Sequence, residues 1–214
     1  MQKIGIIGSG AVGQALAKGF LKYGYPTTIA SRSKDKRNQL IEEIGQGINS
    51  APPEETAKNA DLVIFAVKGS QAVEALENIS QDALSGKTVI DTTNPISDEG
   101  PKNGVLRYTT NINHSLMEEL QEKYQDVRFV KAFSSVGSAH MVDPDFDQKP
   151  TMFICGNDAG AKQQVSRILD QFGWETEDMG TAEAARAIEP LAMLWCIPGF
   201  RENRWNHAFK LLKK

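Results

Sequence analysis

The sequence has few cysteines, no long apolar run and no large excess of either charge. Cys155 and Cys196 are the only cysteines, and their apolar surroundings predict buried thiols in a reducing compartment rather than a disulfide or a metal site. A net charge of −3 gives no basic surface for nucleic acid. Without a basic leader, a cleavage site or a long apolar span, the chain is expected to be cytoplasmic and to make no membrane contact.

Strand and helix patterns alternate along the 214 residues. The run DLVIFAV at residues 61–67 is almost entirely apolar, which is typical of a strand covered on both faces. The βαβα order predicts the α/β class, as a Rossmann-type, doubly wound, mostly parallel sheet with helices on both faces. We expect residues 1–150 to form an NADP-binding Rossmann domain and residues 151–214 to form a small C-terminal α/β extension packed on the same sheet.

A glycine-rich turn joins the first strand to a helix, in the segment KIGIIGSGAVGQALA. Gly8 permits a tight turn, Gly10 leaves room for a pyrophosphate beside the backbone, and Gly13 allows the helix to pack closely on the strand. The free N–H groups at the helix start, near Ala11 and Val12, would face the phosphates. Glycines that serve packing alone are the alternative, but the strand, turn and helix context favours a dinucleotide site.

The end of the second strand, ASRSKDKR, offers no acidic side chain for the ribose 2′-hydroxyl of NAD(H). Neither aspartate nor glutamate stands at Ala30, Ser31 or Arg32, where a carboxylate would repel a 2′-phosphate. Ser31 and Arg32 can instead donate hydrogen bonds to that phosphate. Lys36 and Arg37 add charge one helical turn later. A helix start whose basic residues are simply solvated would show the same pattern. The missing acid favours NADP(H) over NAD(H).

Ligands of open α/β sheets bind beyond the carboxyl ends of the strands, so the later strand ends also concern the site. The small side chains of Ala66 and Val67 would let a ribose pass. Thr93 and Asn94 could hydrogen-bond the nicotinamide half, while a plain turn at Asn94–Pro95 is an equally good interpretation.

The loop SSVGSAHM, residues 134–141, is made mostly of small and hydroxyl residues and leaves room for a flat ligand beside the nicotinamide. The predicted substrate-binding residues are Ser134, Ser135, Val136, Gly137 and Met141. His140 could act as an acid, a base or a ligand contact, although a lone loop histidine is more often solvent-facing. No histidine has the neighbours of a triad or a metal site, and the serines lack a nucleophile elbow. We therefore assign no catalytic side chain and no metal, because the cofactor itself supplies a hydride transfer.

Five segments carry a family resemblance that covers nearly the whole chain: IGIIGSGAVGQALAKGF, ASRSKDK, TTNP, SLMEELQEKYQDVRFVKAF and GTAEAARAIEPLAMLW. Together they resemble the NADPH-dependent reductases of the deazaflavin coenzyme F420. They are also similar to the cytosolic oxidoreductase domain of the STEAP metalloreductases, which pass hydride from NADPH to a flavin. The glycine motif is widespread, whereas the VKAF strand and the tail motif are more restricted.

The resemblance implies NADPH along the strand ends and an acceptor ring stacked on the nicotinamide, against the loop that follows KAF. Carried over to this sequence, it implies a pyrophosphate turn at Ser9, Gly10, Ala11 and Val12, a 2′-phosphate site at Ser31, Arg32 and Lys36, nicotinamide neighbours Ala66, Val67 and Asn94, and acceptor neighbours Ser134, Ser135, Val136 and Met141. Two positions depart from the family, which usually has proline at Lys68 and asparagine at Ser134. Both border the acceptor, so the NADP(H) assignment is the better supported one.

The resulting hypothesis is an NADPH-dependent oxidoreductase that transfers hydride to a deazaflavin, a flavin or a similar small-molecule ring. One alternative is a carbonyl or imine reductase of the pyrroline-5-carboxylate or hydroxyacid type. Those enzymes usually carry a helical domain of ~100 residues or more, of ordinary domain size. Only about 65 residues follow the last core loop here. The other alternative is a non-enzymatic module that senses NADPH.

The tail predicts a homodimer, because its helix is too apolar all round for a lone surface helix. The apolar positions are Ile188, Leu191, Met193, Leu194, Trp195 and Ile197. A helix that simply covers the sheet is a nearly equal alternative.

Overall fold

A six-stranded parallel sheet forms the centre of the protein, whose computed structural model describes residues 1–214. The strand order is β3-β2-β1-β4-β5-β6, and every neighbouring pair is parallel. The strands are β1 Ile4–Ile7, β2 Thr27–Ala30, β3 Ile48–Ala51, β4 Leu62–Phe65, β5 Thr88–Asp91 and β6 Arg128–Lys131. This is the doubly wound order in which the chain starts in the middle of the sheet, and it confirms the predicted fold class.

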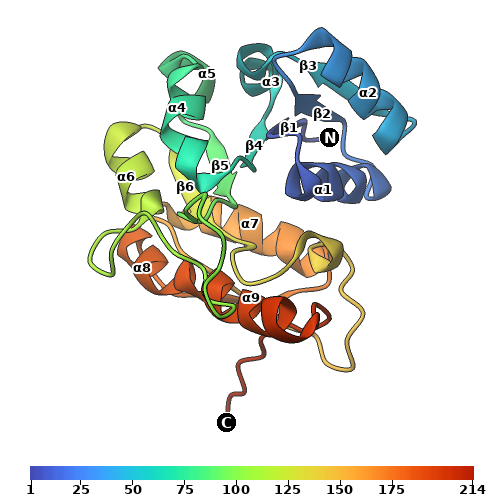
Figure 1. The fold of residues 1–214 in the computed structure, drawn as a ribbon. Coiled ribbons are helices and arrows are strands. Elements are labelled where there is room, and N and C mark those ends of the chain that lie inside the picture. The colour runs from blue at the N-terminus through green and yellow to red at the C-terminus, as the bar shows by residue number, and fades with distance from the viewer.

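Helices cover both faces of the sheet. They are α1 Ala11–Lys22, α2 Lys34–Ile44, α3 Pro53–Asn59, α4 Ala72–Glu77, α5 Gln81–Leu84, α6 Leu116–Lys123, α7 Ala159–Gln171, α8 Ala185–Ile188 and α9 Pro190–Glu202. Figure 1 shows α8 and α9 together at the bottom of the view, with the C-terminal tail extending below them. None of the helices has both the length and the apolar character of a membrane span.

Two hydrophobic cores lie on opposite faces of the sheet, because successive side chains of a strand point to opposite faces. A cluster of 24 buried residues joins Ile4 and Ile6 to side chains of α1, α2 and α7. A second cluster of 22 buried residues joins Ile7 and Phe65 to side chains of α3, α4, α5, α6 and α8. The strands β1 and β4 are buried at every position, as the apolar run at residues 61–67 predicted for β4.

The C-terminal extension contains a second, two-stranded parallel sheet of β7 Thr151–Ile154 and β8 Glu175–Asp178. This sheet is separate from the main one rather than a continuation of it. β7 runs antiparallel to β6 and meets it at a single bridge, where the Lys131 N–H donates to the Cys155 carbonyl at 2.9 Å. Met152, Val165 and Trp174 nevertheless enter the first core cluster, so the extension shares that core. The boundary near residue 150 stays a prediction.

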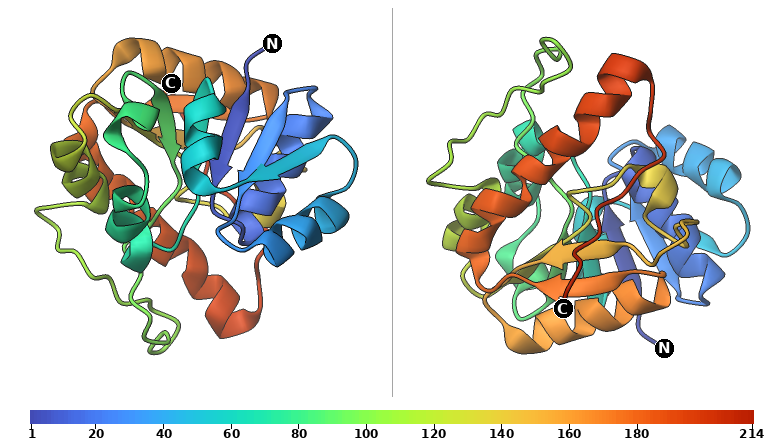
Figure 2. Two further views of the ribbon diagram at one scale, coloured as in Figure 1. Left: turned by 90° about the horizontal axis from the view of Figure 1, so that it is seen from above. Right: turned by 90° about the horizontal axis from the view of Figure 1, so that it is seen from below.

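The last residues of the chain, after α9, are not helical. After α9 the chain turns back and runs beside β7, where the Thr151 N–H donates to the Phe209 carbonyl at 2.9 Å. Figure 2 (right) shows this segment, in dark red, passing over the two-stranded sheet. The segment after α9 therefore packs along the C-terminal extension without forming a helix.

Candidate functional site

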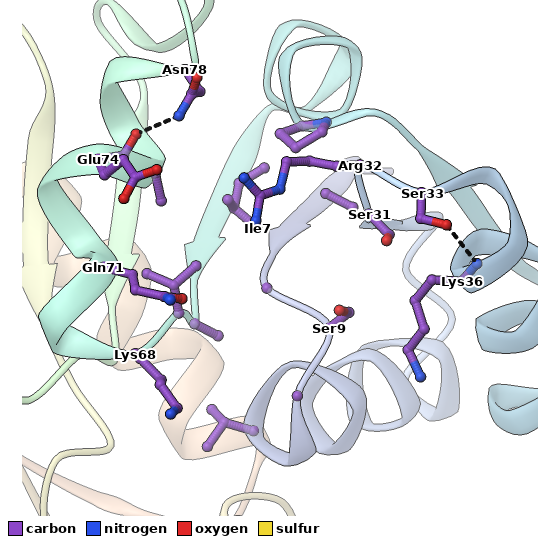
Figure 3. A pocket seen from close by; sticks show the side chains of 18 of the residues that line it. Ile7, Ser9, Ser31, Arg32, Ser33, Lys36, Lys68, Gln71, Glu74 and Asn78 are labelled. Atoms are coloured by element: carbon purple, nitrogen blue, oxygen red, sulfur yellow. Dashed lines mark hydrogen bonds between the residues drawn. The ribbon is translucent and has the colours of Figure 1, made fainter. Parts of the chain in front are cut away.

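A cleft of about 680 Å³ opens beyond the carboxyl ends of β1, β2 and β4. Its lining comes from the turn after β1, the end of β2, the end of β4 and the helical segment that follows β4 (Figure 3). Of the predicted cofactor-binding residues, the cleft brings together Gly8, Ser9, Gly10, Ala11, Val12, Ser31, Arg32, Lys36, Ala66 and Val67. Gly13 and Asn94 are the two that do not line it.

The three glycines of the first turn have different surroundings. Gly8 has a φ of +128°, and a side chain there would collide with the carbonyl of Ala66, so the turn lies directly against the end of β4. A side chain at Gly13 would collide with the carbonyl of Gly8, which explains why Gly13 packs α1 onto the turn instead of facing the cleft. A side chain at Gly10 would meet no atom within 4 Å. The close approach at Gly10 is therefore open to a ligand.

Gly10 is also the N-cap residue of α1, and no side chain caps that helix end. The first-turn N–H groups of a helix have no partner within the helix, and the helix dipole makes this end electropositive. The turn thus offers backbone donors to an anion at the mouth of the cleft. These donors fit the pyrophosphate of a dinucleotide.

The β2 side of the cleft is positively charged. Figure 3 shows the side chain of Arg32 reaching into the cavity, with Ser31 beside it. Lys36 also lines the cleft and donates to Gln39 Oε1 at 3.1 Å. Among the 19 lining residues Glu74 is the only acid, against the cations Arg32, Lys36 and Lys68. This balance fits a ligand with several phosphate charges.

Arg37 shapes this side of the cleft without lining it. Its Nη1 donates to the Ser31 carbonyl at 2.9 Å and to the Arg32 carbonyl at 3.1 Å. Both bonds fix the backbone that carries the two predicted phosphate ligands. Arg37 therefore acts on the turn rather than adding charge inside the cleft, which differs from the expected role.

Sequence reasoning missed the wall formed by the segment after β4. Lys68, Gln71, Glu74 and Asn78 line the cleft opposite Arg32. Positions 71, 74 and 78 repeat at helical spacing, so one face of the segment SQAVEALENIS points at the ligand space. That spacing was the signal available in the sequence. The segment follows β4, and the end of β4 lies against the turn after β1.

The predicted nicotinamide end lies beside the cleft. A side chain at Gly69 would collide with the backbone of Asn94, so Asn94 abuts the residue that follows Lys68. Asn94 Oδ1 is buried and makes no hydrogen bond within the protein. The role of Asn94 toward a nicotinamide stays a prediction.

The predicted acceptor loop is largely buried and does not line this cleft. Buried in this loop are Ser134, Ser135, Val136 and Met141. The Trp174 indole N–H donates to the Met141 carbonyl at 2.9 Å. The room for a flat ligand that this loop was expected to leave is filled at Gly137. The tail helix α9 places Trp195 there, and a side chain at Gly137 would stand 2.5 Å from its Cη2 atom.

The structure shows the surroundings of His140 and of Cys155. His140 is half-buried, with Nε2 3.1 Å from Asn206 Oδ1 in the tail. Cys155 is a buried free thiol, and burial raises its pKa to about 12. No three His, Cys, Asp or Glu side chains are grouped as a metal ion would require.

A buried ion cluster closes the ends of β5 and β6, and sequence reasoning did not find it. The ammonium group of Lys131 lies 2.7 Å from Asp91 Oδ2 and 2.8 Å from Glu189 Oε1, and all three side chains are at most 1% exposed. Burial alone would lower the pKa of Lys131, but the two carboxylates outweigh it and raise the pKa above its ordinary value. The lysine within an apolar strand pattern was the only sequence signal.

The cluster ties distant segments to the strand ends. Lys131 donates to the Thr93 carbonyl at 2.7 Å, and Asp91 Oδ1 accepts from the Thr93 hydroxyl at 2.7 Å. Glu189, at the start of α9, accepts from the N–H groups of Leu116 and Met117 at 3.1 and 3.0 Å. The tail is thus attached to the first turn of α6 and to the end of β6.

Comparison with known proteins finds relatives that use NADP, in agreement with a cleft suited to a phosphorylated dinucleotide. Residues 3–95 match the family described as NADP oxidoreductase coenzyme F420-dependent. The solved structure of a protein from Arthrobacter sp. FB24, described as a candidate F420-dependent NADP reductase, has a TM-score of 0.92 and 26% identity over 100% of both chains. The predicted resemblance to these reductases is confirmed.

Three sequence relatives with named activities also match. The F420-dependent NADP reductase of Methanocaldococcus jannaschii is 27% identical over 204 residues, covering 90% of each chain. The NADPH-dependent reductive aminase of Aspergillus oryzae is 35% identical over 98% of this chain and 63% of its own length. Metalloreductase STEAP3 of Rattus norvegicus is 27% identical over 92% of this chain and 38% of its own length, which confirms the STEAP resemblance.

The chain spans less than two thirds of the aminase and of STEAP3. The matched family, the F420-dependent reductase and the aminase are NADP-dependent oxidoreductases, in agreement with the predicted enzyme class.

Proposed function

We propose that the protein is an NADPH-dependent oxidoreductase that passes hydride to a flat ring such as a deazaflavin or a flavin. The observation that carries the proposal is the cleft at β1, β2 and β4, which combines an open glycine turn, an uncapped helix start and a cationic end of β2. A matched family of NADP oxidoreductases supports the same cofactor.

In this proposal the backbone N–H groups near Ala11 and Val12 hold the pyrophosphate. Ser31 and Arg32 hold the 2′-phosphate, with Lys36 adding charge from the first turn of α2. The nicotinamide supplies the hydride when the cofactor is bound. The protein has to bind the cofactor, orient it and exclude water, and no side chain of the cleft is needed as an acid or base.

The acceptor would meet the nicotinamide at the ends of β5 and β6, near the loop 134–141. Trp195 stands over Gly137 in this structure, so the acceptor ring is not expected to stack on Gly137 itself. The exposed side chains of Leu194 and Phe200 on α9 support a homodimer through the tail. A cytoplasmic location belongs to the same proposal.

Reduction of an imine or carbonyl group is the second candidate. It is favoured by the 35% identity to the Aspergillus oryzae reductive aminase over 98% of this chain. Against it stands the extent of the match, because the chain spans 63% of that protein. A module that only senses NADPH is the third candidate, and it would need no acceptor.

One experiment separates the candidates. The purified protein is mixed with NADPH and, in parallel, with the deazaflavin coenzyme F420, with FMN and with a cyclic imine, and nicotinamide absorbance is followed. We expect oxidation with F420 or FMN and none with the imine. Turnover with the imine alone would favour the second candidate, and binding without turnover of any acceptor would favour the sensor.

A further inference from the structure

Two buried oxygen atoms at neighbouring strand ends make no hydrogen bond within the protein. They are Asn94 Oδ1, after β5, and Ser134 Oγ, after β6. The β5–β6 register pairs Asp91 with Lys131, and each orphaned residue follows its strand end by three positions. Both therefore leave the same edge of the sheet at the same level.

Buried polar groups in folded proteins are almost always paired, and leaving one unpaired is costly. The only other orphaned side-chain oxygen outside the ion cluster belongs to Thr176 in β8, within the second sheet. Two such atoms, each just beyond the end of one of two adjacent strands, point to a shared ligand. Their chemistry is complementary, because an amide oxygen accepts a hydrogen bond and a hydroxyl can donate one.

The backbone before Ser134 is strained in the manner of a functional site. Phe133 has a φ of +64°, in the left-handed region, and its side chain is 2% exposed. A bulky residue in this region is a genuine outlier, and such strain persists only where the surrounding structure enforces it. The turn at Phe133 ends the line of β6 and sets the direction in which Ser134 leaves the sheet.

The buried ion cluster fixes the backbone next to Asn94. Lys131 and Asp91 both bond to Thr93, the residue immediately before Asn94. Asn94 in turn lies against Gly69, next to the cleft residue Lys68. Asn94 is thus fixed beside the β4 end of the cleft, away from its phosphate-binding end.

We propose that Asn94 and Ser134 form a subsite for the carboxamide of the nicotinamide. Asn94 Oδ1 accepts a hydrogen bond from the carboxamide N–H₂ group, and Ser134 Oγ donates one to the carboxamide oxygen. The assignment rests on the proposed function, and it moves Ser134 from the acceptor to the cofactor. It gives the nicotinamide ring a fixed orientation without an acid or base.

Calorimetry with three ligands tests the subsite: NADP⁺, 2′-phospho-ADP-ribose, which has no nicotinamide, and the 3-acetylpyridine analogue of NADP⁺, whose ring carries a methyl ketone instead of the carboxamide. Ser134→Ala should weaken NADP⁺ binding about threefold to tenfold, the value of one hydrogen bond. Its affinity for 2′-phospho-ADP-ribose should not change. Ser138→Ala, in the same loop, is the matched control and should change neither affinity.

Asn94→Ala should weaken NADP⁺ by a similar factor but should barely affect the acetylpyridine analogue, which has no N–H group to donate. Ser134→Ala should weaken both, because both ligands keep the carbonyl oxygen. Unchanged NADP⁺ binding in Ser134→Ala and Asn94→Ala would overturn the subsite, as would equal losses for NADP⁺ and 2′-phospho-ADP-ribose. Failure of the wild-type protein to bind NADP⁺ at all would instead overturn the proposed function.

Discussion

The two halves of the carboxyl edge of the sheet are built differently. At β1, β2 and β4 the edge is open and is lined by glycines, small side chains and cations. At β5 and β6 it is closed by the Lys131 ion cluster and by Trp195 of the tail helix. The open half has local sequence signals for its turns, although the turn at Gly8 lies against Ala66 of a distant segment. The closed half depends on contacts between segments more than 50 residues apart, such as Lys131 and Glu189.

This difference separates two tasks of an oxidoreductase. Phosphates can be held by a turn and a helix start, which need little support from the rest of the fold. A reacting ring has to be held within a fraction of an ångström, and rigid surroundings achieve that. In the proposed function the tail would supply such surroundings, because Glu189 connects it to both β6 and α6.

The largest effect should come from removing the central cation of the closed half. Lys131→Met leaves the carboxylates of Asp91 and Glu189 buried without a partner, so we expect a loss of about 3–5 kcal/mol in unfolding free energy. Urea denaturation measures it. Lys123→Met, which removes a solvent-exposed ion pair with Glu77, is the control and should change stability little. Equal stability of both variants would contradict the role of the cluster.

In the open half, a small substitution should reduce binding without reducing stability. A methyl group at Gly10 meets no protein atom, so Gly10→Ala should leave the urea midpoint unchanged. The methyl group would occupy the approach of the pyrophosphate, and loss of one charged hydrogen bond predicts about tenfold to a hundredfold weaker NADPH binding. Gly8→Ala, which collides with Ala66, should lose both stability and binding. NADPH binding by Gly10→Ala equal to wild type would place the phosphates elsewhere.

The contact between Glu118 of α6 and Arg186 of α8 should depend on pH. The hydrogen bonds from Arg186 hold the pKa of Glu118 at about 2, below its ordinary value of 4.5. A depressed carboxyl pKa contributes stability that is fully present above pH 4.5 and is lost as the pH falls toward 2. The stability difference between wild type and Glu118→Gln should therefore shrink across that window. A difference that stays constant with pH would rule out this titration.

The smallest effect should follow from His140→Ala. The imidazole contacts Asn206 of the tail and lies outside the cleft, so turnover should fall far less than the about 10²–10⁴-fold expected for a general acid or base. Steady-state rates with NADPH and the active acceptor measure this. A loss of the full size would make carbonyl or imine reduction the better hypothesis.

The open half could be predicted from the sequence because its signals are local. Gly8, Gly10 and Gly13 stand at fixed spacing after an apolar strand, and Arg32 stands where an acid would bind a ribose. The closed half could not be predicted in the same way. Nothing near Gly137 in the sequence indicates that Trp195 would cover it, and the pairing of Lys131 with Glu189 exists only after the tail has folded back.

The cleft should select NADPH through the cationic end of β2. Calorimetric titration of the wild-type protein and of Arg32→Ala with NADPH and NADH tests it most directly. The account predicts that wild type prefers NADPH and that Arg32→Ala binds NADPH roughly tenfold to a hundredfold more weakly, with little change for NADH. Equal affinity of the wild-type protein for the two nucleotides would contradict it.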